Sequence, residues 1–185
     1  LRTPLNAIIG FSNLLNRSDI QPELKEYIQG IQISGANLLG IVNDILDFEK
    51  IRSGMLRIEH IEFDLAGLLH SVVTMVRSSA EEKHLALQLV MQKDLPEVLL
   101  GDPMRLTQIL INLLSNAIKF TSSGSVTLRI QVIPNPTPDA TIRIRFEVED
   151  TGIGIAASEH ERIFERFIQA SSETSRKFGG TGLGL

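Results

Sequence analysis

The residues best suited to chemistry lie between Asp102 and Phe120, where amide and ammonium side chains recur at helical spacing. Asn112, Asn116 and Lys119 are four and three residues apart, so they project from a helix as one stripe. Asparagine weakens a helix interior because its side chain competes for the backbone. Amide oxygens suit Mg2+, which takes few protein ligands and keeps phosphate oxygens. The stripe therefore predicts a site for Mg2+ and phosphate, although a solvated polar face would explain a single asparagine equally well.

A second motif, Asp-Thr-Gly-Ile-Gly at 150–154, follows a run of alternating apolar residues at 142–148. Asp150 continues that alternation, so we expect it on the apolar side of a strand, where a carboxylate needs a hydrogen-bond donor. An exocyclic amine such as adenine N6 is a suitable donor. Gly152 and Gly154 allow a sharp turn and a close approach to a flat ligand. The alternative is an aspartate that caps the next turn in solvent.

A third motif, at 179–184, has four glycines in six residues and can cradle phosphates with its backbone N–H groups. It is not a Walker loop, because no Gly-Lys-Ser/Thr follows it, and no strand precedes it as in a dinucleotide-binding fold. Lys177, just before it, could add a phosphate contact or be ordinary surface charge. The phosphate-binding residues predicted here are Lys177, Gly180, Thr181, Gly182, Leu183 and Gly184.

Helices and strands that could position these motifs alternate after residue 58. A helix is predicted from Asp102, as N-cap with Pro103 in the first turn, to about Phe120. Another helix is predicted from 65 to about 83, and strands at 61–63, 85–91, 126–132 and 142–148. The buried side of the 102–120 helix is predicted to comprise Leu106, Ile109, Leu110, Leu113, Leu114, Ala117 and Ile118. This mixture indicates an α+β fold, an α/β sandwich with one sheet layered against helices.

Residues 1–54 are predicted to form two helices with a break near residues 16–22. The second helix carries a heptad seam, in which a row of residues seven apart is followed by a second row four positions later. The first row is Leu24, Ile31, Leu38 and Ile45, and the second is Ile28, Gly35 and Val42. So much apolar surface exceeds what a hairpin covers by itself, so we expect a homodimer in which the hairpin is half of a four-helix bundle. Packing of the hairpin on the chain's own second domain is the alternative.

Composition narrows the function classes. The net charge of −4 argues against nonspecific binding of nucleic acid, and the absence of cysteine excludes a disulfide framework and a thiolate zinc site. No apolar run is long enough to span a membrane. Both ends look cut, because the chain begins with Leu1 and ends in a glycine-rich motif. We therefore expect a cytoplasmic fragment that meets a membrane only through missing parts of its parent.

Together these motifs resemble those of the sensor histidine kinases of two-component signalling. Asn-Leu-Leu-Ser-Asn-Ala-Ile-Lys at 112–119 looks like the family's N box, and 150–154 and 179–184 look like its two glycine boxes. Ile-Phe-Glu-Arg-Phe at 163–167 looks like the F box. Leu-Arg-Thr-Pro-Leu at 1–5 resembles the segment just after the phosphoacceptor histidine. The segment Phe-Ile-Gln-Ala at 167–170 is similar to the corresponding segment of hybrid kinases, which carry a receiver domain further on.

The resemblance implies a dimerisation hairpin at 1–54, followed by a Bergerat-type ATP-binding domain at 58–185 whose C-terminal part is missing. By the same resemblance Asn116, assisted by Asn112, would hold Mg2+, Lys119 would touch phosphate and Asp150 would bind adenine. The γ-phosphoryl group of ATP would pass to a histidine and then to an aspartate in the receiver domain of a response regulator.

The acceptor histidine itself would lie upstream of Leu1, four residues before Thr3. None of the four histidines replaces it, because all of them fall in the second domain. Thr3 would orient water for removing phosphate from the regulator, so the implied catalytic residues are Asn116, Lys119 and Thr3. A gyrase-type or chaperone-type ATPase is an alternative that lacks the segment at 1–5. A non-catalytic dimerisation module is another, which Asn112, Asn116 and Asp150 oppose.

Overall fold

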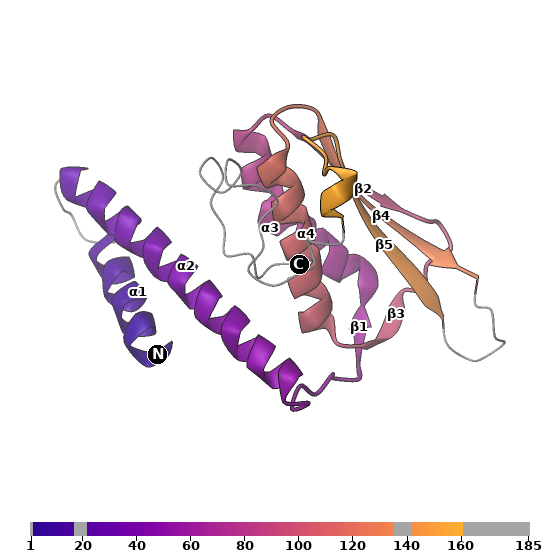
Figure 1. The fold of residues 1–185 in the computed structure, drawn as a ribbon, viewed down its shortest axis with the longest axis horizontal. Coiled ribbons are helices and arrows are strands. Elements are labelled where there is room, and N and C mark those ends of the chain that lie inside the picture. Colours follow the sequence, from indigo (N-terminus) through magenta and orange to yellow (C-terminus); the bar gives the residue numbers. More distant parts are fainter. Residues whose placement is uncertain (1, 17–21, 135–141, 161–185) are drawn as a thin grey trace. The chain divides into compact units, whose positions relative to one another are not determined.

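The computed structural model describes residues 2–16, 22–134 and 142–160. The chain divides into two compact units, the first ending at Arg57 and the second beginning at Ile58. Each unit is described by itself below. Figure 1 shows the first as a pair of helices and the second as a sheet with helices.

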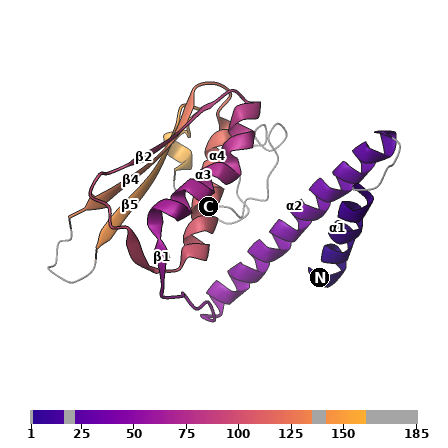
Figure 2. The same ribbon diagram turned by 180° about the vertical axis from the view of Figure 1, so that it is seen from behind.

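The first unit is an antiparallel hairpin of α1 (Arg2–Asn16) and α2 (Pro22–Arg52), which confirms the prediction of two helices. Figures 1 and 2 show α1 beside the N-terminal half of α2. The Gln32 side chain donates a hydrogen bond of 2.7 Å to the Asn13 side chain. At Gly35 the helices are so close that a β-carbon would lie 2.9 Å from Cγ1 of Ile9. A larger residue at this position would have to displace the Ile9 side chain.

The two heptad rows of α2 have different environments. Ile28 and Gly35 are buried and Val42 is half-buried, as expected of a row that faces α1. The other row is exposed, namely Leu24 at 48%, Ile31 at 48%, Leu38 at 51% and Ile45 at 44%. From α1, exposed apolar side chains are added by Ile8, Phe11 and Leu15. We call these seven residues the open stripe. The described part of the chain leaves the open stripe in solvent.

The second unit contains a three-stranded sheet in the order β2–β4–β5, with β2 parallel and β5 antiparallel to the central strand. Helices α3 and α4 lie side by side over one face of this sheet (Figures 1 and 2). The elements are β1 (Ile61–Asp64), α3 (Leu65–Glu82), β2 (Ala86–Met91), β3 (Val98–Gly101), α4 (Pro103–Phe120), β4 (Ser125–Ile133), β5 (Arg143–Asp150) and a 3-10 turn at Ala157–Glu159. The predicted α+β arrangement is confirmed.

The core lies between the sheet and the two helices. Its central strand contributes Val126, Leu128 and Ile130, which are almost fully buried. The neighbouring strands add half-buried residues on the same face, namely Leu87, Leu89, Ile144, Phe146 and Val148. The other face is polar and carries exposed ion pairs, such as Arg129 with Glu149 at 3.6 Å. The predicted alternation of the strands is thus confirmed, whereas β3, which pairs with β1, was not predicted from the sequence.

Two helices of the chain end in the same motif with different residues. After α2, Gly54 has φ +67, and the N–H groups of Gly54 and Met55 donate to Ile51 and Lys50. These are the two bonds of a Schellman motif, with glycine at the left-handed position. After α3, the corresponding bonds run from His84 to Glu81 and from Leu85 to Ala80. The left-handed residue there is His84, with φ 55, which costs energy because it has a β-carbon.

Replacing His84 with glycine is expected to raise the free energy of unfolding by about 0.5–1 kcal/mol, because glycine adopts positive φ without that steric cost. Urea denaturation followed by circular dichroism measures the difference. His60→Gly is the matched control, since His60 is also exposed but lacks a positive φ, and it should not stabilise the chain. A His84→Gly variant less stable than the wild type would contradict this account of the helix end.

Candidate functional site

The helix that carries the predicted stripe begins with a side-chain cap. Asp102 Oδ1 accepts a hydrogen bond of 2.9 Å from the Arg105 backbone N–H, as the sequence predicts. Its Oδ2 accepts one of 3.2 Å from the N–H of Glu59. The bond from Arg105 is the main reason that the pKa of Asp102 lies below its ordinary value. The cap fixes the residue at which α4 begins.

The buried side of α4 comprises Leu110, Leu114, Ala117 and Ile118. Leu106, Ile111 and Leu113 are half-buried, but Ile109 is 56% exposed, so the prediction that Ile109 is buried was wrong. The reason is its position on the helix. Arg105, Ile109, Asn112 and Asn116 are spaced four, three and four residues apart, so Ile109 lies in the row of the two asparagines. The face that carries these amides therefore also offers an apolar side chain.

Asn112 and Asn116 are half-buried on this face. Their side-chain amides make no hydrogen bond to any residue that the structure describes. Half-buried amides of this kind are stabilised when a ligand supplies their partners. No group of three or more His, Cys, Asp or Glu side chains in the described residues could hold a metal ion. The donors present, two amide oxygens, fit an ion that keeps most of its ligands from water and phosphate, as Mg2+ does.

Lys119 is the third residue of the stripe and lies in the last turn of α4. Its Nζ lies 5.1 Å from the centroid of the Phe120 ring, within the range of a cation–π contact. Partial burial lowers the pKa of Lys119. A phosphate next to the ammonium group would favour its charged form.

Asp150 is the last residue of β5 and pairs with Val126 of β4. As predicted, it lies on the apolar side of the sheet, but it is exposed to solvent and not buried. Its Oδ1 accepts a hydrogen bond of 2.8 Å from the N–H of Gly152, two residues on. This is the turn-capping alternative from the sequence. Its Oδ2 has no hydrogen-bond partner in the described ranges, 2–16, 22–134 and 142–160.

The turn after Asp150 packs directly against the C-terminal end of α4. The N–H of Ile153 lies 3.4 Å from the carbonyl oxygen of Phe120, which accepts its hydrogen bond. A β-carbon at Gly152 would lie 2.5 Å from that oxygen and 2.8 Å from Oδ1 of Asp150. Gly152 is therefore needed for the approach of two chain segments. We call this contact between Phe120 and residues 152–153 the α4–β5 junction.

Gly154 has φ +67 with open space where a side chain would be, so its role is to turn the chain.

Thr151 ties the ends of β4 and β5 together. Its side-chain oxygen accepts a hydrogen bond of 3.0 Å from the Ser125 N–H, and the carbonyl oxygen of Ser123 lies 3.3 Å away as an acceptor for its hydroxyl proton. The sequence analysis assigned no role to Thr151. The only sequence sign of this role is a threonine directly after Asp150. It could not reveal the partners of Thr151, because they lie 26 and 28 residues away in the chain.

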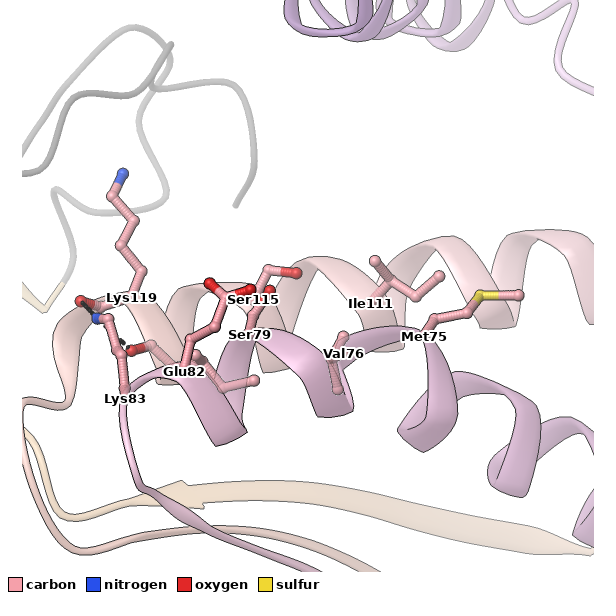
Figure 3. Close-up of a pocket in the computed structure, with 9 residues that line it drawn as sticks. Met75, Val76, Ser79, Glu82, Lys83, Ile111, Ser115 and Lys119 are labelled. Carbon is pink, nitrogen blue, oxygen red and sulfur yellow. Dashed lines mark hydrogen bonds between the residues drawn. The ribbon is translucent and has the colours of Figure 1, made fainter. Parts of the chain in front are cut away.

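The structure thus places the turn after Asp150 at the C-terminal end of α4, where Lys119 lies, with Asn116 and Asn112 earlier on the same helix. A groove of about 500 Å³ also lies between α3 and α4, lined by residues that include Met75, Glu82, Lys83, Ser115 and Lys119 (Figure 3). Of the predicted site residues only Lys119 lines this groove, so it is not the predicted nucleotide site. Thr3 lies in α1, in the other unit. Lys177 and the motif at 179–184, with Gly180, Thr181, Gly182, Leu183 and Gly184, lie outside the described residues, as does the segment at 163–167.

Two family models match this chain. The model described as "His Kinase A (phospho-acceptor) domain" matches residues 1–54. The model described as "Histidine kinase-, DNA gyrase B-, and HSP90-like ATPase" matches residues 101–185. The first covers the hairpin helices, and the second covers the helix that carries the stripe together with the glycine motifs.

Relatives and solved structures agree with these matches. Signal transduction histidine-protein kinase BarA of Escherichia coli K12 is 42% identical over 185 residues, which are 100% of this chain and 20% of BarA. The chain thus spans about a fifth of the length of such curated relatives.

A full-length ShkA structure in complex with AMPPNP is 36% identical, with a TM-score of 0.77, covering 99% of this chain and 36% of ShkA. Histidine kinase ThkA, solved in complex with response regulator protein TrrA, is 26% identical with a TM-score of 0.56, covering 91% of this chain and 47% of ThkA. In the described residues, no helix is both long enough and apolar enough to cross a membrane.

Replacing Thr151 with valine is expected to lower the free energy of unfolding by about 1 kcal/mol, because the valine keeps the shape but leaves the Ser125 N–H without its acceptor. Thr151→Ser is the matched control, since it keeps the hydroxyl and should retain most of the stability. Guanidinium denaturation of both variants measures the difference. Equal stability of Thr151→Val and the wild type would show that the tie between β4 and β5 contributes nothing.

Proposed function

This chain belongs to the sensor histidine kinases, and we propose that it forms the part of the kinase core that binds ATP with Mg2+ and dimerises. The γ-phosphoryl group would pass to a histidine that precedes Leu1 in the parent protein, and from there to an aspartate of a response regulator. The observation that carries the proposal is the pair of half-buried amides, Asn112 and Asn116, on the helix whose C-terminal end contacts the Asp150 turn.

The nucleotide would span the α4–β5 junction. Asp150 would accept a hydrogen bond from the exocyclic amine of adenine through Oδ2, because Oδ1 already accepts the N–H of Gly152. Lys119 would lie beside the phosphates. Gly154 leaves open space above the turn, which a flat base could approach closely. The free carboxylate oxygen supports adenine over guanine, which presents a carbonyl oxygen at the corresponding ring position.

Mg2+ would be held by the amide oxygens of Asn116 and Asn112 together with phosphate oxygens, and when bound it neutralises charge on the phosphates. The chain's own contribution is alignment and charge. The buried side of α4 holds the amides on its opposite face, and the ammonium group of Lys119 would face charge that builds up during transfer. Transfer of a phosphoryl group depends mainly on such positioning and electrostatic stabilisation. Lys177 and residues 180–184 would add phosphate contacts.

The hairpin would supply the second half of the reaction. Thr3 lies in α1, one helical turn after the place where the acceptor histidine would be, and would orient water when phosphate is removed from the regulator. The ThkA–TrrA complex supports a response regulator as the partner. The open stripe supports dimerisation, because apolar side chains exposed at heptad spacing are those that pack between helices in a bundle.

Replacing Asn116 with alanine is expected to weaken binding of ATP in the presence of Mg2+ by at least about tenfold, since it removes an amide ligand, and a water that takes its place on Mg2+ does not tie the ion to α4. Titration calorimetry of the chain with ATP and Mg2+ measures the affinity. Ser115→Ala is the matched control, because Ser115 lines the groove toward α3 and not the stripe. Wild-type affinity in Asn116→Ala would refute the assigned role.

Replacing Leu38 with glutamate is expected to raise the dissociation constant of the dimer by at least about a hundredfold, because two copies of the charge would be buried in a symmetric interface. Sedimentation velocity over a range of concentrations measures it. Gln29→Glu adds the same charge to an exposed position outside the open stripe and should leave the dimer intact. A Leu38→Glu protein that stays dimeric would place the interface elsewhere.

A further inference from the structure

Lys83 connects the ends of the two helices that cover the sheet. It is the C-cap residue of α3, and its side chain reaches the C-terminal end of α4. Its Nζ donates hydrogen bonds of 2.8 Å to the carbonyl oxygen of Ile118, 2.8 Å to that of Lys119 and 3.4 Å to that of Thr121. Figure 3 shows Lys83 beside the end of α4, with the Lys119 side chain extending away from it. An ammonium group has three protons to donate, and three acceptors surround this one.

These bonds share the last carbonyls of α4 with the α4–β5 junction. The final carbonyls of a helix have no partners within the helix and carry its negative end. At the end of α4 the carbonyls of Ile118, Lys119 and the C-cap Thr121 accept from Lys83, and that of Phe120 accepts from Ile153. One turn of backbone is therefore held from one side by α3 and from the other by the turn after Asp150.

The helix does not need Lys83 in order to end. The Thr121 N–H and hydroxyl both donate to the carbonyl oxygen of Ala117, at 3.1 and 2.7 Å, and Thr121 has an extended backbone. The three bonds from Lys83 act on the carbonyls after that point, where α4 meets the segment that carries Asp150. Their effect is on where this end of α4 lies, since a bond to a neighbouring element constrains position as well as satisfying an acceptor.

We propose that Lys83 is a positioning residue for the nucleotide site, which sets the distance between the phosphate-binding end of α4 and the adenine-binding turn at Asp150. This inference rests on the proposed function, because it assumes that ATP contacts both elements at once. Lys83 itself does not touch the nucleotide in this account. Its side chain acts through the backbone of residues 118–121, which carries Lys119 and the acceptor of the α4–β5 junction.

If Lys83 positions the two elements, its replacement should affect the binding of ATP and of adenosine differently. ATP with Mg2+ contacts the stripe and the Asp150 turn together, so its affinity depends on the distance between them. Adenosine contacts the turn alone, so its affinity does not. Lys83→Met removes the charge and the donors while keeping an unbranched stem. We expect it to weaken binding of ATP about tenfold and binding of adenosine less than about twofold.

The experiment titrates the chain with ATP and Mg2+ by calorimetry, and with adenosine by NMR. Lys83→Arg should recover most of the ATP affinity, because guanidinium also donates to several acceptors. Lys93→Met is the matched control, an identical change at an exposed lysine after β2, and should bind both ligands like the wild type. If Lys83→Met does not fold, as judged by circular dichroism, Lys83→Gln carries the same comparison with a shorter donor.

Three results would overturn the proposal while the proposed function stands. These are wild-type ATP affinity in Lys83→Met, equal weakening for ATP and adenosine, and fewer binding sites at an unchanged dissociation constant, which indicates partial unfolding only. A wild-type chain that does not bind ATP would instead refute the proposed function, and this inference with it.

Discussion

The carbonyl oxygen of Phe120 is the point on which the candidate site depends. It ends the helix that carries Asn112, Asn116 and Lys119, and it accepts the N–H of Ile153 in the turn that Asp150 opens. Only glycine fits at position 152, because a β-carbon would collide with this oxygen. The contact joins residues more than thirty positions apart in the chain, so the two halves of the proposed nucleotide site are brought together by backbone atoms.

The rest of the second unit holds this contact in place. Asp102 fixes the start of α4, the sheet and α3 bury Leu110 and Leu114, and Lys83 holds the final carbonyls. The amides of the stripe are left half-buried without described partners, which is a cost that a bound ligand would offset. A site whose polar groups are positioned before binding loses little entropy when the ligand arrives. Such preorganisation suits the proposed phosphoryl transfer, which depends on alignment more than on covalent help.

Much of this arrangement could be predicted from the sequence, because it follows from local patterns. The cap at Asp102, both helices of the hairpin, and the alternation of β4 and β5 each depend on residues within a few positions of one another. The strand β3 was missed because Val-Leu-Leu-Gly is too short to show a period and forms a strand only by pairing with β1. Ile109 was predicted to be buried because it is apolar, but its spacing from Asn112 and Asn116 places it on their face of α4, where it is exposed.

What the sequence could not supply are contacts between segments far apart. Nothing near Gly152 indicates that its missing side chain makes room for Phe120, and nothing near Lys83 indicates three carbonyls at the end of another helix. In the hairpin, by contrast, the residues that form the contact can be recognised in the sequence. Its heptad rows are visible in the sequence, but only packing decides that Ile28 and Gly35 face α1 while Ile31 and Leu38 stay exposed. Because Gly35 lets Ile9 of α1 pack closely, the row that contains Gly35 is buried within the hairpin. The row that contains Leu38 stays exposed and can contact another molecule.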